Sequence, residues 1–169
     1  MNDLVLLAAL LRGPAYGYAL KQTAGLIFGN DAIHNNIIYP ALRKFMESRW
    51  VAQSNVEGER GQQRKQYRIT PAGRKHLVDR LKTFDAGDAA DESAFLFRVA
   101  LFDLLPGKCR DAILESRQSY LTGRAEKLRE LRDATEPASF GAVALDRVIA
   151  RIRDELRWIR DVERKVKGE

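Results

Sequence analysis

Residues 50–73 read WVAQSNVEGERGQQRKQYRITPAG. In residues 50–56 and again in residues 64–70, the pattern of side chains no longer has the helical period. It shows the alternation typical of a β-strand. Residues 57–63 hold two glycines and no apolar residue, which predicts a flexible, exposed hairpin loop. Thr70-Pro71 then supplies a helix cap followed by a proline at the first helical position. The stretch therefore predicts strand, loop, strand and the start of a helix.

Three helices are predicted before this stretch and one after it. Apolar residues recur at helical spacing within residues 3–11, 15–28, 35–49 and 71–84. Pro40 conflicts with the third helix, because proline is tolerated in the first helical turn but costs about 3 kcal/mol deeper inside. We therefore expect this helix to begin late or to be bent at its start. Three helices, two strands and a helix form the order of a winged helix-turn-helix domain, whose third helix lies in the DNA major groove.

The positive charge of the chain is confined to its first half. Residues 1–83 hold 13 lysines and arginines against 6 acidic residues, whereas residues 84–169 hold 16 against 17. The first half thus carries a net charge of +7 and the second half of −1. Because neutralisation of phosphates drives nucleic-acid affinity, this split predicts a polyanion-binding part joined to a neutral part with another role.

Short motifs within residues 4–83 resemble the PadR family of bacterial regulators. They are Gly13-Pro14, Gly17-Tyr18-Ala19-Leu20, Ile38-Tyr39-Pro40-Ala41-Leu42, Tyr67-Arg68-Ile69-Thr70 and Ala72-Gly73. The resemblance implies a dimeric winged-helix regulator, often a repressor, whose C-terminal helices form the dimer. It also implies release from DNA on binding a small aromatic or hydrophobic effector. The extended C-terminal part is similar to that of one branch of the family.

The chain departs from the family pattern in three places. Arg49 stands where relatives usually carry glycine, at a cost of about 1 kcal/mol if the backbone there is left-handed. The wing reads Gly-Gln-Gln-Arg at residues 61–64, and the third helix is entered through His-Asn-Asn-Ile at residues 34–37. The last two differences put the operator sequence in doubt and leave the class of protein unchanged.

The predicted contacts with double-stranded DNA begin on the second and third helices. Asn35 and Asn36 either bind adenine or cap the third helix. Tyr39 lies on a different face from the apolar stripe, so it either contacts DNA or packs against the wing. Tyr18 and Lys21 either hold a phosphate or have no such role. Basic residues of the third helix and the wing are assigned to phosphates or to a narrow minor groove, with a solvated surface as the alternative: Arg43, Lys44, Arg49, Arg60, Arg64 and Lys65.

The second half reads as a polar linker, residues 85–92, followed by a helical domain, residues 93–169. Residues 95–105 are apolar nearly all round, and two long helices follow over residues 106–133 and 139–166. The last helix carries a heptad seam, which indicates coiled-coil pairing within the chain or across a homodimer. The residues assigned to the dimer are Phe95, Val99, Phe102, Leu145, Ile149, Ile152, Leu156 and Ile159. Trp158 either lines an effector pocket or simply packs.

Other classes of protein find little support in the sequence. The single Cys109 is interpreted as a structural thiol, with a redox role as the alternative, and His76 is expected on a helix surface. We find no phosphate-binding glycine loop, nucleophile elbow or metal-ligand cluster, so we expect neither an enzyme nor a cofactor. No apolar run is long enough to cross a membrane, and no signal peptide is recognised, so we expect a cytoplasmic protein. A winged-helix module that docks proteins instead of DNA is the alternative function.

Overall fold

The computed structural model describes residues 2–28, 35–57 and 62–168, and of residues 2, 21, 24–28 and 35–37 only the backbone. The chain divides into two compact units, Met1–Thr83 and Phe84–Glu169. No helix among the described residues combines the length and the apolar character that a membrane crossing requires.

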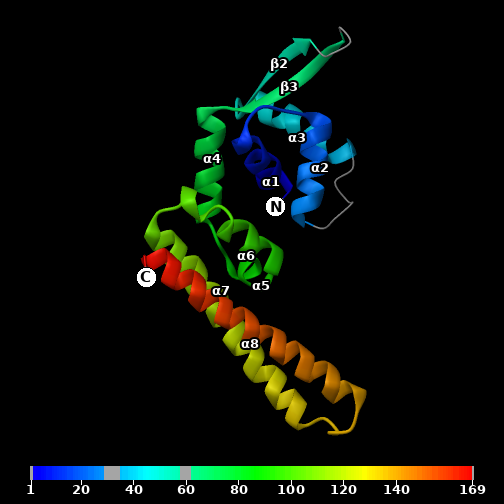
Figure 1. Ribbon diagram of the computed structural model, residues 1–169, viewed down its shortest axis with the longest axis vertical. Helices are drawn as coiled ribbons and strands as arrows, with labels where there is room; N and C mark the ends of the chain where they lie inside the picture. Colours follow the sequence, from blue (N-terminus) through cyan, green and yellow to red (C-terminus); the bar gives the residue numbers. More distant parts are fainter. Residues whose placement is uncertain (1, 29–34, 58–61, 169) are drawn as a thin grey trace. The chain divides into compact units, whose positions relative to one another are not determined.

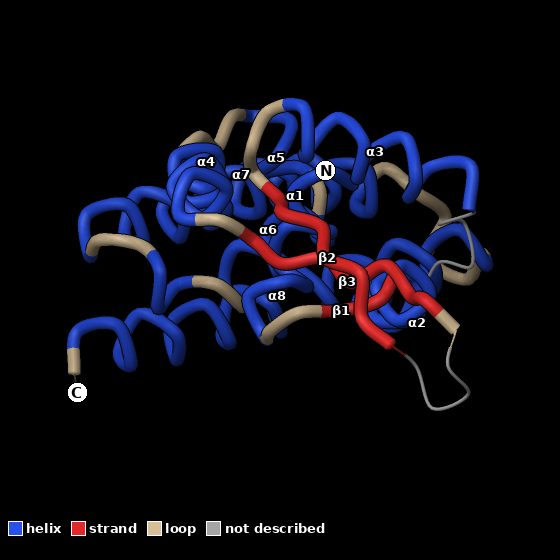
Figure 2. The backbone as a smooth tube through the Cα atoms, turned by 90° about the horizontal axis from the view of Figure 1, so that it is seen from above, coloured by secondary structure: helices blue, strands red, loops and turns tan. Residues whose placement is uncertain are grey.

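The first unit consists of helices and a small antiparallel sheet (Figure 1). Its elements are α1 (Asn2–Ala9), the 3-10 turn η1 (Leu10–Arg12), β1 (Ala15–Tyr16), α2 (Gly17–Phe28), α3 (Asn35–Glu47), β2 (Val51–Glu57), β3 (Gln63–Ile69) and α4 (Pro71–Lys82). The predicted order is confirmed, and the chain is mainly helical with a small sheet. Figure 2 shows the three strands, of which β3 is the middle one.

Strand β1 corrects the expectation of a two-stranded wing. Ala15 pairs with Tyr67, and Tyr16 pairs with Gln66, at the point where we expected the second helix to begin. Two residues are too few to show an alternating pattern, so the sequence carried no signal for this strand. The pairing ties the connection between α1 and α2 to the hairpin of β2 and β3.

The core of the first unit is formed by the apolar faces of its helices. Leu6, Leu7, Phe45 and Leu77 are fully buried, with 0% of each residue exposed. Helix α3 contributes Ile38, Leu42 and Phe45, the face predicted from their spacing. Of the two alternatives expected for the start of α3, the late beginning is wrong, because α3 starts at Asn35 and includes Pro40.

Thr70 joins the start of α4 to the turn that follows α3. Its backbone N–H donates to the carbonyl of Trp50 at 2.9 Å, and its hydroxyl donates to the carbonyl of Arg49 at 2.7 Å. The same hydroxyl oxygen accepts the N–H of Gly73 at 3.0 Å, which caps α4. Arg49 has a φ of 59°, so this turn does adopt the left-handed conformation that favours glycine.

Replacing Arg49 by glycine is expected to stabilise the first unit by about 1 kcal/mol, because glycine adopts a positive φ without a steric penalty. Urea unfolding followed by circular dichroism measures the change in the free energy of unfolding. A loss of stability would show that contacts of the Arg49 side chain outweigh the strain of its backbone.

Trp50 and His76 stack face to face, with ring centroids 3.6 Å apart and an angle of 13° between the ring planes. His76 is half-buried, which corrects its expected surface position. Burial lowers the pKa of His76, and the positive charge of Arg80 lowers this pKa further. The stack therefore contains the neutral imidazole.

The free energy of unfolding is expected to decrease as the pH falls below about 6.5, the ordinary pKa of histidine. Because the folded-state pKa of His76 lies below this value, the unfolded chain takes up the proton first, and the pH decrease favours unfolding. The free energy of unfolding should decrease less between about pH 7.5 and 5 in His76→Phe than in the parent chain. His34 is present in both proteins, so an equal decrease in both would contradict the assignment to His76.

The second unit is entirely helical within its described residues. It consists of α5 (Ala86–Ala90), α6 (Glu92–Val99), the 3-10 turn η2 (Phe102–Leu104), α7 (Gly107–Asp133) and α8 (Phe140–Lys167). Helices α7 and α8 run side by side as a hairpin (Figure 1). The long helices were predicted almost to the residue, and the Ser139 hydroxyl caps α8 by accepting the N–H of Ala142 at 3.2 Å.

Three expectations about the start of this unit are corrected. The segment expected to be a linker forms α5, which is capped by Asp85 and buries Ala89. Phe84 does not continue the stripe of α4, which ends at Lys82, and its ring lies 6.4 Å from that of Phe95. Likewise, the apolar segment 95–105 is divided between α6 and η2.

The apolar heptad seam of α8 packs against other helices of the same chain. Phe95 and Ile159 are 0% exposed and Ile152 is 4% exposed. Phe102 and Ile149 are buried too, whereas Val99, Leu145 and Leu156 are half-buried. Since the buried side chains are covered inside their own chain, they offer no surface to a second copy, which corrects that part of the expected dimer interface. Large apolar side chains that do remain exposed include Leu131, Phe140 and Val143.

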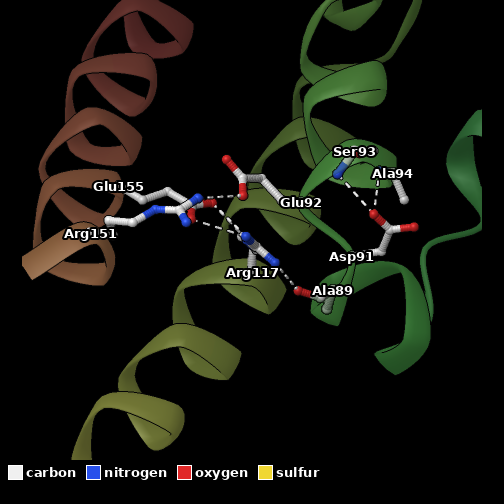
Figure 3. Close-up of polar contacts among 8 residues, drawn as sticks. All are labelled: Ala89, Asp91, Glu92, Ser93, Ala94, Arg117, Arg151 and Glu155. Carbon is white, nitrogen blue, oxygen red and sulfur yellow. Dashed lines mark hydrogen bonds and ion pairs between the residues drawn. The ribbon is translucent and has the colours of Figure 1, made fainter. Parts of the chain in front are cut away.

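Arg117 is buried where α5, α7 and α8 meet (Figure 3). Its Nε and Nη2 donate to the two carboxylate oxygens of Glu155 at 2.8 and 3.0 Å. Its Nη1 donates to the carbonyl of Ala89, the buried residue of α5, at 2.7 Å. The guanidinium also lies 5.5 Å from the ring centroid of Phe95. One side chain thus links α7 to both neighbouring helices.

Candidate nucleic-acid interface

A hollow of about 440 Å³ opens in the first unit, where β1, α2, α3 and β3 meet. Its walls are mostly aromatic or basic, and we call these residues the tyrosine hollow: Tyr16, Gly17, Tyr18, Ala19, Tyr39, Arg64, Lys65 and Tyr67. Four of them, Tyr18 of α2, Tyr39 of α3 and Arg64 and Lys65 of β3, were predicted as DNA contacts from separate parts of the sequence. The fold brings them to one site.

The backbone explains why these elements converge. The pairing of β1 with β3 sets Tyr16 opposite Gln66, so the start of α2 lies against the middle strand (Figure 2). At Gly17, a Cβ atom would lie 3.2 Å from Cε1 of Tyr39, which is closer than ordinary van der Waals contact. Glycine at this position therefore allows the ring of α3 to lie against the first turn of α2.

The tyrosines of the hollow differ in exposure. Tyr18 and Tyr39 are 67% and 51% exposed, whereas only 4% of Tyr67 is exposed. Burial raises the pKa of Tyr67, and the nearby hydroxyl of Tyr39 raises it further. Tyr67 therefore remains a neutral phenol at physiological pH, and Tyr18 and Tyr39 offer exposed hydroxyls that can donate hydrogen bonds to phosphate oxygens.

The basic residues of α3 and of the turn that follows it lie outside the tyrosine hollow. Arg43, Lys44 and Arg49 are all exposed. Lys44 forms an ion pair with Asp3 of α1, with Nζ and Oδ2 2.9 Å apart. This pair gives Lys44 a structural partner, whereas the side chains of Arg43 and Arg49 form no ion pair with the residues that the structure describes.

Four of the predicted contacts lie outside the described part of the chain. The side chains of Lys21, Asn35 and Asn36 are not described, and neither is any part of Arg60. Sequence reasoning, in turn, missed the walls of the hollow formed by Tyr16 and Tyr67. The motifs Gly17-Tyr18 and Tyr67-Arg68 contained the signal, but only the pairing of β1 with β3 shows that they meet.

No group of three or more metal-ligating His, Cys, Asp or Glu side chains occurs within the described ranges. The tyrosine hollow offers hydrogen-bond donors, positive charge and aromatic surface. These are groups that bind phosphates and sugars. The first unit is thus a winged helix-turn-helix domain with an exposed basic and aromatic surface beside its third helix. The chain belongs to the PadR-like family of transcriptional regulators, whose family model matches residues 6–79.

Several solved structures are similar to this chain. TA0346 from Thermoplasma acidophilum is 32% identical, with 46% of this chain and 74% of TA0346 covered and a TM-score of 0.43. Protein smu.1704 from Streptococcus mutans UA159 is also 32% identical, with 48% and 73% covered and a TM-score of 0.43. PadR from Bacillus subtilis, solved in complex with operator DNA, is 16% identical, with 97% and 98% covered and a TM-score of 0.44. The comparison with curated proteins found no match.

Proposed function

We propose that this chain binds specific DNA sequences and thereby regulates transcription. The observation that carries this proposal is the convergence of exposed Tyr18, Tyr39, Arg64 and Lys65 on one surface of a winged helix-turn-helix unit. The net charge of +7 in residues 1–83 supports it, because a DNA-binding surface must neutralise phosphates. Membership of a family of transcriptional regulators supports it independently.

In the proposed complex, the N-terminal turn of α3 enters the major groove. Asn35 and Asn36 read base edges there, while Tyr18 and Tyr39 hold the adjacent backbone. Arg64 and Lys65, at the base of the hairpin of β2 and β3, contact a neighbouring phosphate or the minor groove. Arg43 and Arg49 add phosphate contacts. Lys44 contributes less to phosphate binding, because its charge is paired with Asp3.

The regulator acts as a homodimer in this proposal, with the helical second unit joining two copies. Two recognition helices about 34 Å apart would then require an inverted-repeat operator. Exposed Leu131, Phe140 and Val143 provide apolar surface for self-association. We further propose a cytoplasmic repressor that a small effector releases from its operator. A PadR structure in complex with p-coumaric acid is consistent with such a ligand.

An electrophoretic mobility-shift assay with the DNA upstream of the protein's own gene tests the proposal. Specific binding should be at least about 1,000-fold tighter than binding to a scrambled duplex at physiological salt. Lys65→Gln should weaken binding to all sequences and reduce the slope of log K against log salt by about 1. Lys75→Gln, an exposed residue of α4 outside the tyrosine hollow, is the matched control and should leave this slope unchanged.

Equal affinity for specific and scrambled DNA would contradict a role as a specific regulator. Absence of DNA binding even at low salt would favour the alternative of a winged-helix module that docks proteins. Sedimentation of the chain as a monomer at micromolar concentration would contradict the dimer alone.

A further inference from the structure

Pro40 lies inside the proposed recognition helix, at a position where helices rarely tolerate proline. It is the sixth residue of α3 and so lies beyond the first helical turn. Because proline has no backbone N–H, the carbonyl of Asn36 cannot receive the helical hydrogen bond from position 40. The helix nevertheless continues through Pro40 to Glu47. A local cost of this kind is expected mainly at functional positions.

Neither packing nor capping explains this proline. The opposite face of α3 supplies the apolar core, through Ile38, Ala41, Leu42 and Phe45. Pro40 itself is exposed, and it is not part of the walls of the tyrosine hollow. Alanine in its place would supply the missing N–H and leave the buried face unchanged. The stability of the first unit therefore does not require a proline here.

Pro40 lies near the middle of the exposed face of α3. At about 100° per residue, Tyr39 lies on one side of it and Lys44 on the other. Tyr39 lines the tyrosine hollow, and Lys44 is paired with Asp3 of α1. Both edges of the face thus have neighbours within the first unit, whereas its middle, with Pro40 and Arg43, points away from the core. In a winged helix-turn-helix domain, this is the face that enters the major groove.

The chemistry of the proline ring restricts what Pro40 can recognise on DNA. The ring consists of methylene groups and carries no donor or acceptor, so it forms no hydrogen bond with base edges or phosphates. Among the groups that the four bases present in the major groove, only the 5-methyl group of thymine is apolar. Contact between this methyl group and the ring removes apolar surface from water, which is favourable.

We propose that Pro40 is a specificity-determining residue that contacts the 5-methyl group of a thymine in the operator. The contact supplements the hydrogen bonds proposed for Asn35 and Asn36, and it favours thymine at one position of each half-site. The rigid ring loses almost no side-chain freedom on binding, unlike a longer apolar side chain. The inference rests on the DNA-binding regulator proposed above and adds a base preference to it.

Deoxyuridine differs from thymidine only in lacking this methyl group, so it tests the contact. A duplex that the full chain binds is first selected from a random library, and each thymine of the selected site is then replaced by deoxyuridine in turn. Fluorescence anisotropy measures the dissociation constant of each duplex. We expect one thymine per half-site at which the replacement weakens binding about two- to fivefold, the effect of removing one apolar group from a contact. The other thymines should give a change below about 1.5-fold.

Variants of Pro40 assign the effect to this residue. Pro40→Gly removes the apolar ring, so the thymine and deoxyuridine duplexes should bind equally within about a factor of 1.5. Pro40→Ala keeps one methyl group, and its discrimination should be intermediate. Glycine and alanine are both better helix formers than proline, so neither variant should be less stable than the parent chain in urea unfolding. Pro71→Ala, at an exposed proline of α4, is the matched control and should keep the full discrimination.

Discrimination that persists unchanged in Pro40→Gly would overturn the inference, because another residue or the shape of the DNA would then respond to the methyl group. An equal loss of discrimination in Pro71→Ala would overturn it too. The failure of the thymine contact and that of the proposed regulator are distinguishable. A chain that binds its selected site but treats thymine and deoxyuridine alike at every position refutes the contact alone. A chain for which no sequence can be selected refutes the regulator, and the thymine contact with it.

Discussion

Replacing Gly73 by alanine is expected to destabilise the first unit by about 3 kcal/mol, a large part of the stability of a domain of this size. A Cβ atom at position 73 would lie 2.1 Å from the carbonyl oxygen of Trp50. That oxygen accepts the N–H of Thr70 at 2.9 Å and belongs to backbone, so it cannot turn aside as a flexible side chain would. Relief of the clash requires α4 to move away from the turn at Arg49 and Trp50, which breaks the hydrogen bonds of Thr70.

Urea unfolding of Gly73→Ala beside Gly123→Ala measures the effect. Gly123 lies within α7, and a Cβ atom there meets nothing within 4 Å. The same substitution should therefore stabilise the helix at position 123 by about 0.5–1 kcal/mol, because alanine loses less backbone entropy than glycine. A cost below about 1 kcal/mol at position 73 would show that α4 adjusts without losing its cap.

The second large effect is expected at Arg117, where Arg117→Met should destabilise the second unit by about 3–5 kcal/mol. Methionine fills similar space but donates no hydrogen bond. Glu155, whose side chain is 18% exposed, and the carbonyl of buried Ala89 would both lose their partner. An unpaired carboxylate in a mostly buried position is costly because neither water nor a cation solvates it.

A double-mutant cycle separates the loss of the pair from the loss of packing. Glu155→Leu removes the carboxylate, so adding it to Arg117→Met should restore at least about half of the lost stability. Arg132→Gln serves as the control, since Arg132 and Asp146 form an exposed pair of the same two helices at 2.9 Å. Its loss should cost less than about 1 kcal/mol. If the double variant is as unstable as the sum of the two single variants, the unpaired charge is not the cause.

The fold was predictable where an element is long or carries a local signal. Helices α7 and α8 show many turns of helical periodicity, and Ser139 and Thr70 mark helix starts through their hydroxyl groups. Strand β1 and helix α5 are short, and their positions depend on partners far along the chain. Gly73 was recognised as part of a motif. Glycine is required there because the backbone of Trp50 approaches closely, and no spacing in the sequence reveals this contact.

The candidate sites divide in the same way. The basic and aromatic residues beside the wing could be predicted one by one, because their chemistry suits DNA in any arrangement. The apolar seam of α8 was also correctly recognised as a pairing surface, but periodicity alone does not tell whether the partner is α7 or another copy. Arg117 was missed altogether, because a buried arginine has no signature until its acceptors on two other helices are known.

The pairing of Ala15 with Tyr67 has a consequence for how the chain folds. The hairpin of α7 and α8 forms from neighbours joined by a short connection, and such local contacts form quickly. Strand β1 must instead find a partner across nearly the whole first unit, which requires closing a long loop of chain. The tyrosine hollow exists only after this slow closure, so a nascent or partly unfolded molecule has no assembled surface with which to occupy an operator.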